Sequence, residues 1–84
     1  MAFKYRSRTD IVATILQVST EPALKTKIMY KAFLSFKQIN EYLDTLTANN
    51  MLHFDQEMET YVITTKGSNF LATYNTLEPL LINR

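Results

Sequence analysis

The sequence predicts a single α+β domain that is mostly helical, and three observations support this fold class. The first half of the chain holds three segments whose apolar residues recur at helical spacing, separated by capping and turn residues. Two short runs with period-two alternation follow, and a fourth amphipathic segment comes last. Because 84 residues leave room for one core only, we expect one domain over residues 1–84. Its core should span about residues 7–66, followed by a C-terminal helix at about residues 65–81.

The first helix is expected over about residues 8–19. Ser7 and Asp10 form a capping-box pattern, in which each side chain accepts a hydrogen bond from the backbone N–H of the other residue. Apolar residues then recur at helical spacing, at Ile11, Val12, Ile15 and Leu16. The helix should end before Pro22, because a residue that precedes proline is disfavoured in the α conformation.

A second and a third helix are expected close together. The second runs from about Leu24 to Lys31, and its inner stripe is expected to be Leu24, Ile28 and Ala32. The third runs from about Phe36 to Ala48, and its expected buried stripe is Phe36, Ile39, Leu43 and Leu46. Ser35 and Gln38 form a second capping box at the start of the third helix. Asn49–Asn50 should end it, since Asn tolerates the left-handed conformation.

A β-hairpin is expected next. The segments Leu52–Asp55 and Thr60–Thr64 alternate with period two, as strands with one buried face do. The connecting segment Gln56–Glu59 contains no Gly, Pro or Asn, so we expect a poorly specified and mobile turn.

The last helix should begin after Thr64 and reach Pro79. It carries apolar and aromatic residues at Phe70, Leu71, Tyr74 and Leu77. Gly67, the only glycine in the chain, falls in its first turn. Because Gly weakens a helix, we expect a neighbouring backbone to approach closely there.

Composition argues against several function classes. The absence of Cys removes disulfides, thiolate catalysis and the common zinc sites, and it is typical of a cytoplasmic protein. There is no apolar run near the ~20 residues of a membrane span and no signal-peptide pattern. With one His, no Gly-rich phosphate loop and no buried-looking carboxylate pair at helical spacing, we expect neither an enzyme nor a cofactor. His53, Asp55 and Glu57 share a strand face, but such a set is far more often a polar surface, so we expect no metal.

Charge is distributed unevenly along the chain. Residues 1–37 hold seven Lys and Arg against two acidic residues, a net charge of +5. Residues 38–84 hold two basic residues against six acidic ones, a net charge of −4. Only the first half is therefore suited to a phosphate backbone, whereas the second half is better suited to a protein partner.

The order helix, helix, helix, hairpin, helix is that of a winged helix-turn-helix, and the chain resembles the small archaeal proteins of that kind. The resemblance covers about residues 6–81 and is carried by the segments RSRTDIVATILQ, KTKIMYKAFLSFKQINEYLDTL and YVITTKGSNFLATYNTLEPLL. That family includes transcriptional regulators and archaeal chromatin-type proteins that dimerise through a C-terminal helix. The resemblance implies binding of double-stranded DNA, a nucleoid-associated place in the cytoplasm and, as in the coiled-coil members, a homodimer.

The chain departs from that family in two features that matter for function. Its wing and third helix are acidic where the family's are often basic. Its last helix is also expected to be too short for a long coiled coil, because Pro79 and the terminus at Arg84 limit it.

The second and third helices carry the expected nucleic-acid contacts. A recognition helix lies in the major groove with its N-terminal residues at base edges, while the preceding helix crosses the backbone. We therefore expect base contacts from Lys37, Gln38, Asn40 and Glu41, with Ser35 both capping the helix and touching DNA. Phosphate contacts are expected from Lys25, Lys27, Lys31, Arg6 and Arg8. The alternatives are a solvated helix face, lysines that serve solubility and a disordered N-terminal arm.

The last helix carries the expected dimer interface, because its apolar residues exceed what a small core can absorb. The interface would comprise Phe70, Tyr74, Leu77, Leu80 and Leu81, with Phe3 and Tyr5 contributing. A different function stays open at this stage, namely a winged helix that docks onto a protein through its acidic hairpin and third helix. The sequence identifies no small-molecule effector and no DNA target.

Overall fold

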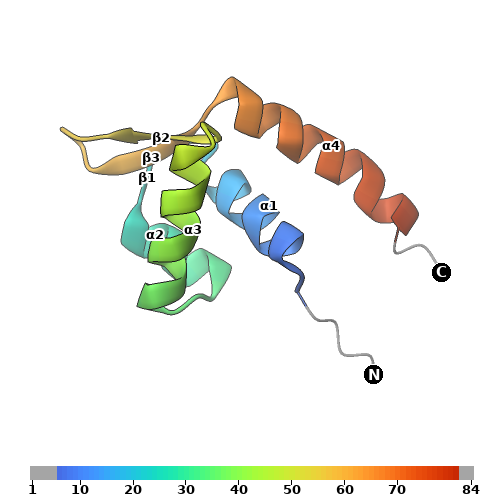
Figure 1. Cartoon of the computed structure of the whole chain (residues 1–84), viewed down its shortest axis with the longest axis horizontal. Helices are drawn as coiled ribbons and strands as arrows, with labels where there is room; N and C mark the ends of the chain where they lie inside the picture. The colour runs from blue at the N-terminus through green and yellow to red at the C-terminus, as the bar shows by residue number, and fades with distance from the viewer. Residues whose placement is uncertain (1–5, 82–84) are drawn as a thin grey trace.

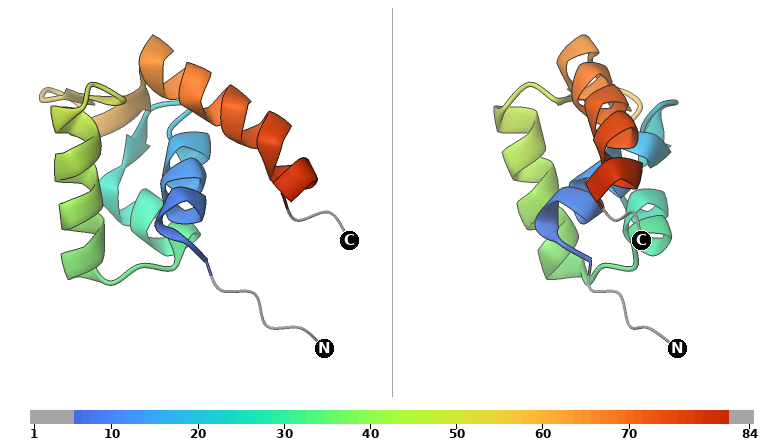
Figure 2. Two further views of the ribbon diagram at one scale, coloured as in Figure 1. Left: turned by 45° about the vertical axis from the view of Figure 1, so that its right-hand side comes forward. Right: turned by 90° about the vertical axis from the view of Figure 1, so that its right-hand side faces the viewer.

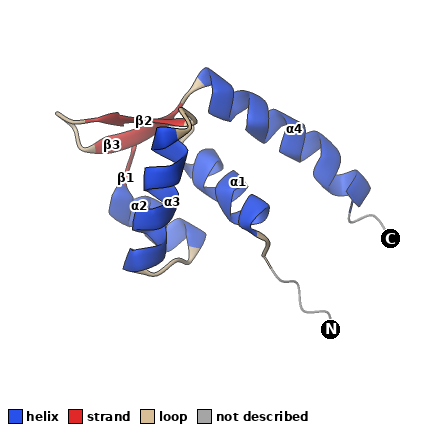
Figure 3. Ribbon diagram, in the orientation of Figure 1, coloured by secondary structure: helices blue, strands red, loops and turns tan. Residues whose placement is uncertain are grey.

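The computed structural model describes residues 6–81, with side chains over residues 6–77. Its elements in chain order are α1 (Arg8–Val18), β1 (Ala23–Leu24), α2 (Lys25–Ala32), α3 (Phe36–Ala48), β2 (Leu52–Asp55), β3 (Thr60–Ile63) and α4 (Thr65–Leu81) (Figure 1, Figure 3). The four expected helices and the hairpin are all present, and their ends agree with the sequence-based bounds to within two residues, the largest difference being that α4 continues past Pro79 to Leu81. Within the described residues, no helix is both long and apolar enough to cross a lipid bilayer.

Helices α1, α2 and α3 pack around a common core, and α4 runs alongside α1 (Figure 2). The largest fully buried apolar side chains come from all three helices and from β2; they are Ile15, Leu16, Ile28, Ile39, Leu43 and Leu52. Both capping boxes form as expected, Ser7 with Asp10 and Ser35 with Gln38. Asn50 has a φ of 63°, which is the left-handed conformation expected where α3 ends.

The sheet contains one strand that the sequence did not indicate. β1 pairs antiparallel with β3, and β3 pairs antiparallel with β2, so the strand order is β1-β3-β2. Because successive strand residues face opposite sides, Ala23 is buried whereas Leu24 is 52% exposed. The prediction that Leu24 belongs to the inner stripe of α2 is therefore wrong, while Ile28 and Ala32 are buried as predicted.

Phe36 also departs from the prediction. The buried stripe of α3 consists of Ile39, Leu43 and Leu46, whereas Phe36 in the first turn is 62% exposed. Helical spacing gives the direction of a side chain, but it does not say whether another element covers that side chain. Among the described residues, only part of the Phe36 ring is covered, and most of it is left at the surface.

The turn of the hairpin is better specified than its composition suggests. Asp55 Oδ1 accepts hydrogen bonds from the backbone N–H groups of Glu57, at 3.0 Å, and Met58, at 3.2 Å. Glu59 then takes a left-handed φ of 55°. The expectation of a poorly specified turn is wrong, because a strand-end Asp supplies the turn geometry from outside the connecting segment.

Helix α4 is attached to the body at its start and again near its middle. At its start, Thr64 Oγ1 accepts from the backbone N–H of Gly67 at 3.0 Å and donates to the carbonyl oxygen of Asn50 at 2.6 Å. A Cβ at Gly67 would lie 2.3 Å from the carbonyl oxygen of Met51, which confirms the predicted close approach. Further along, the Tyr74 hydroxyl donates a short hydrogen bond to Asp10 Oδ1 of α1.

Candidate nucleic-acid interface

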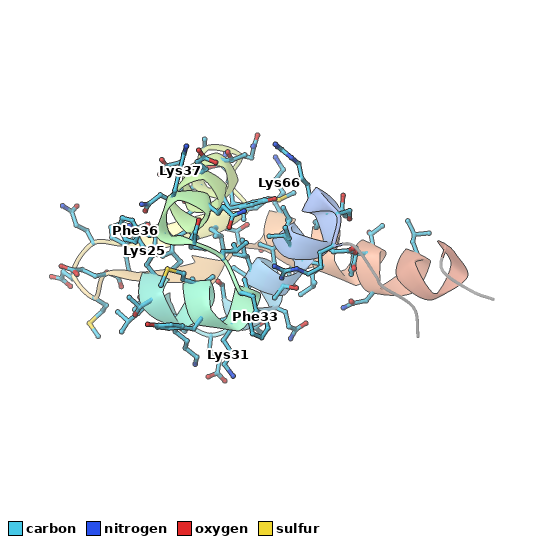
Figure 4. The ribbon with its side chains drawn as sticks, turned by 90° about the horizontal axis from the view of Figure 1, so that it is seen from below. Lys25, Lys31, Phe33, Phe36, Lys37 and Lys66 are labelled. Carbon is cyan, nitrogen blue, oxygen red and sulfur yellow. The ribbon has the colours of Figure 1, made fainter. Side chains whose placement is uncertain are left out.

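The first turn of α3 is exposed and held in place by its capping box. The backbone N–H of Gln38 donates to Ser35 Oγ at 3.1 Å, and Gln38 Oε1 accepts from the backbone N–H of Ser35 at 3.0 Å. Lys37 lies in the same turn, is exposed, and points away from α2 (Figure 4). The predicted recognition residues of this turn therefore stand on a rigid, solvent-facing helix end.

Lys25 joins the start of α2 to this turn. Its Nζ donates a hydrogen bond to Asn40 Oδ1 at 2.6 Å and lies 5.3 Å from the centroid of the Phe36 ring. Figure 4 shows Lys25 beside Phe36, at the edge where α2 meets α3. A hydrogen bond and a cation–π contact together fix the direction of a long and otherwise flexible side chain. Two predicted site residues, Lys25 and Asn40, are thus in direct contact.

Arg8 is placed beside the opposite edge of α3. It lines a shallow groove of about 380 Å³ between α1 and α3, together with Gln38 and Glu41. The remaining lining residues are Val12, Tyr42, Thr45 and Leu46. Arg8 is consequently near α3, the predicted recognition helix, as a phosphate contact from the first helix would require.

Arg6 has an intramolecular role. Its Nη1 donates to the carbonyl oxygen of Ala32 at 2.6 Å, and its Nη2 donates to that of Phe33 at 3.4 Å. A cation at this position pairs with the carbonyls at the C-terminus of α2 and with the negative end of the helix dipole. The side chain is exposed, but these two contacts direct it to the protein.

A second exposed surface lies on the side of α2 away from α3. Lys31 and Phe33 project there, opposite to Lys37 (Figure 4). Phe33 is 84% exposed and has a φ of 56°, a left-handed conformation that costs a residue with a Cβ about 1–2 kcal/mol. Tyr30 on the same helix is 73% exposed. The structure therefore divides the predicted lysines between two faces of α2.

The hairpin brings acidic side chains to its tip. Glu57 and Glu59 are exposed, and Met58 between them is 67% exposed. In β3, burial and, to a lesser extent, the negative charge of Asp44 raise the pKa of Tyr61 above its usual value. Among residues 6–77, no three His, Asp or Glu side chains gather into a possible metal site.

Comparison with known proteins decides the family. The sequence model of the family described as winged helix-turn-helix matches residues 5–81. The chain belongs to the winged helix-turn-helix family.

A solved structure supports this winged helix-turn-helix fold independently. Sso10a-2, a DNA-binding protein from Sulfolobus solfataricus, superimposes with a TM-score of 0.84 at 24% sequence identity. The match covers 93% of this chain and 84% of that one. At this identity the likeness concerns the fold alone. No curated protein matches the chain significantly in sequence.

The predicted dimer residues of this winged helix-turn-helix domain occupy different environments. Phe70 is half-buried against the core, and half-buried Tyr74 bonds to Asp10 of its own chain. Leu77 is 46% exposed. Phe3 and Tyr5 lie outside the described residues, as do the side chains of Leu80 and Leu81. Among the residues whose side chains are described, Leu77 is the one that α4 leaves most available for a partner.

Two aromatic residues at this site were not identified from the sequence. Phe36 was predicted to lie in the core, and no prediction was made for Phe33. The sequence feature that could have indicated an exposed Phe36 is its place as the first residue of α3, directly after the Ser35 cap. The contact between Lys25 and Asn40 had no local signal, because it joins residues 15 positions apart across the turn.

Proposed function

We propose that the protein binds duplex DNA through α2 and α3, as a homodimeric transcriptional regulator or chromatin-type protein of the nucleoid. The observation that carries this proposal is the cation of Lys25, held against Asn40 and Phe36 beside the exposed first turn of α3. A fixed cation next to a projecting helix end suits a phosphate that borders the major groove. Membership of the winged helix-turn-helix family and the likeness to a DNA-binding protein support the same function.

The start of α2 offers a second element of support. Its N-cap residue Leu24 makes no side-chain capping hydrogen bond, and its first turn contains no acidic residue. The backbone N–H groups of such a turn, together with the positive end of the helix dipole, favour a bound phosphate. Lys25 and Lys27 lie in this same turn and would add their charges to it.

A salt titration tests DNA binding directly. We expect the logarithm of the affinity for labelled duplex DNA to fall linearly with the logarithm of salt concentration. Changing Lys25, Lys27 and Lys37 together to Ala should make the slope shallower by up to about 3, one for each lost phosphate contact. Lys66→Ala, in α4, is the single-charge control and should leave the slope nearly unchanged. Undetectable binding at low salt, or a slope equal to wild type in the triple variant, would contradict the proposal.

The homodimer is proposed to form through the outer part of α4, where Leu77 is exposed. Light scattering at micromolar concentration should then give twice the monomer mass, and Leu77→Lys should return the monomer. A two-fold dimer would place its recognition helices about 34–36 Å apart, one turn of DNA. A monomeric wild type would remove this paired geometry without affecting DNA binding by a single domain.

The exposed tip of the hairpin favours one alternative function, protein docking. Met58 lies there between two exposed acidic residues, Glu57 and Glu59, which together suit a basic partner with an apolar patch. The salt titration separates the two functions, because a docking module of this kind would show no affinity for duplex DNA at low salt.

A further inference from the structure

The two amide side chains of the first turns of α3 share one arrangement. Gln38 Oε1 accepts a hydrogen bond from the backbone N–H of Ser35 at 3.0 Å, and Asn40 Oδ1 accepts from Lys25 Nζ at 2.6 Å. Both oxygens are therefore turned toward the protein, and both NH₂ groups are the ends directed away from these contacts.

The chemistry of the two partners fixes these orientations. A lysine ammonium and a backbone N–H can only donate, so each must face the oxygen of the amide and not its NH₂ group. Reversing either amide would oppose two donors and lose a hydrogen bond. For Asn40 the loss would include a charge-assisted bond, which is about twice as strong as a neutral one.

Gln38 and Asn40 lie on either side of the line of α3 residues, Lys37 and Glu41, that would enter the major groove of DNA. With 3.6 residues per turn, residues two apart lie about 200° apart around the axis, on opposite sides of a line through Lys37 and Glu41. Lys37 contributes a third donor group to this line, and Glu41 supplies a carboxylate acceptor one turn further along. The start of α3 thus presents hydrogen-bond donors, and the acceptor, the Glu41 carboxylate, lies one turn further along the helix.

We propose that the domain favours guanine over adenine at the base pairs that face the first turn of α3, because the amide oxygens of Gln38 and Asn40 are held by hydrogen bonds within the protein. The proposal rests on the DNA-binding function proposed above. Reading adenine with an amide requires its NH₂ at N7 and its oxygen at N6, whereas guanine presents two acceptors, O6 and N7. An amide whose oxygen is engaged matches guanine, and the Glu41 carboxylate matches the N4 amino group of cytosine.

Three matched duplexes separate this readout from the shape of DNA. Alternating G·C, inosine·cytosine and A·T duplexes of equal length are titrated with the full chain at one salt concentration. Inosine keeps the O6 and N7 of guanine in the major groove but lacks its minor-groove amino group. We expect the G·C and inosine·cytosine duplexes to bind alike, and roughly fivefold or more tighter than A·T, since a good base contact discriminates by at least about that factor.

Two variants test the stated cause. Lys25→Met frees the oxygen of Asn40, so the ratio of G·C to A·T affinity should fall at least about twofold, as A·T loses less affinity than G·C. Gln38→Glu keeps the capping hydrogen bond but replaces the NH₂ donor by an acceptor, and it should lower the same ratio. Lys31→Met removes an equal charge from the far side of α2 and should leave the ratio unchanged. Thermal unfolding monitored by circular dichroism checks that each variant is folded.

The outcomes distinguish the inference from the function on which it rests. Salt-dependent binding with equal affinity for the three duplexes, or a ratio unchanged by Lys25→Met and Gln38→Glu, would overturn the guanine preference alone. Inosine·cytosine binding that equals A·T binding would assign any preference to the minor groove and would also overturn it. Absence of binding to every duplex at low salt would overturn both the preference and the proposed function.

Discussion

Helix α4 is held to the rest of the domain by specific contacts, whereas α2 and α3 leave large side chains exposed to solvent. α4 is held by close contacts, with Gly67 against the carbonyl of Met51 at one end and Tyr74 bonded to Asp10 further along. Helices α2 and α3 and the turn between them instead leave three large aromatic side chains exposed on different faces, Tyr30, Phe33 and Phe36. Side chains that stay exposed bury little apolar area and therefore contribute little to the stability of the domain.

This difference predicts that stability and binding depend on separate sets of residues. Substitutions at the α4 attachment should change the free energy of unfolding and leave the DNA affinity of the folded protein intact. Lys37→Ala, at an exposed position, and Gln38→Glu, which keeps the capping hydrogen bond, should do the reverse. The predictions below test this separation, from the largest expected effect to the smallest.

Gly67→Ala should have the largest effect on stability. The added Cβ would lie 2.3 Å from the carbonyl oxygen of Met51 and 2.9 Å from Cγ1 of Ile63, so the start of α4 must shift. We expect a loss of about 2–3 kcal/mol in the free energy of unfolding, measured with urea, despite the better helix propensity of Ala. Asn69→Ala, at an exposed position of the same helix, is the control and should have a small effect. An unchanged midpoint for Gly67→Ala would contradict the close approach.

Tyr74→Phe should cost less, because it removes one hydrogen bond and leaves the ring in place. The lost partner is the carboxylate of Asp10, so we expect about 1–2 kcal/mol of destabilisation. Tyr30→Phe provides a matched control on the other region, where the ring is 73% exposed and the change should stay within about 0.5 kcal/mol. Equal effects of the two substitutions in urea unfolding would remove the contrast between the regions.

Phe33→Gly should stabilise the protein. Glycine adopts the left-handed conformation of this residue at no steric cost, and part of this gain is offset by the greater freedom of Gly in the unfolded chain. We expect a net gain of about 0.5–1 kcal/mol in thermal or urea unfolding. Phe33→Ala removes the ring but keeps the Cβ, so it should give no such gain. A destabilised glycine variant would mean that the ring itself contributes to the fold.

Replacing Glu57 and Glu59 together by Gln should have the smallest effect. Both lie at the exposed tip of the wing, where they repel a phosphate backbone over a distance that salt screens. We expect DNA affinity to rise about two- to fourfold at low salt and the free energy of unfolding to change by less than about 0.5 kcal/mol. A fall in DNA affinity would instead assign the acidic wing a direct role in binding.

Local patterns in the sequence predicted the helices, because capping boxes and apolar spacing act within a few residues. Ser7 with Asp10 and Ser35 with Gln38 set two helix starts correctly, and Gly67 correctly indicated a close approach. The strand β1 was not predicted, since two residues are too few to show alternation and the pairing with Thr60 and Tyr61 lies far along the chain.

The features of the site that could not be predicted from the sequence depend on contacts between residues far apart in the chain. Helical spacing assigned Phe36 to the core, although only the position of neighbouring elements decides whether that face is covered. The candidate residues of the site could be predicted from local sequence. The partner of Asn40 and the intramolecular contacts of Arg6 could not, because they depend on how α1, α2 and α3 pack together. The order of elements was therefore predictable, and the direction in which each polar group points was not.

The double attachment of α4 has a consequence for how a dimer would read DNA. Because Gly67 packs against Met51 beside the wing and Tyr74 is bonded to α1, the helix would act as a stiff strut between α3 and Leu77 in the proposed homodimer. Two domains joined through such struts cannot adjust their separation to accommodate an altered site. In the proposed homodimer, inserting base pairs between the half-sites should make affinity rise and fall with a period of about 10.5 base pairs, the helical repeat of DNA. The affinity of the homodimer would then depend on the rotational position of the two half-sites around the DNA helix as well as on their sequence.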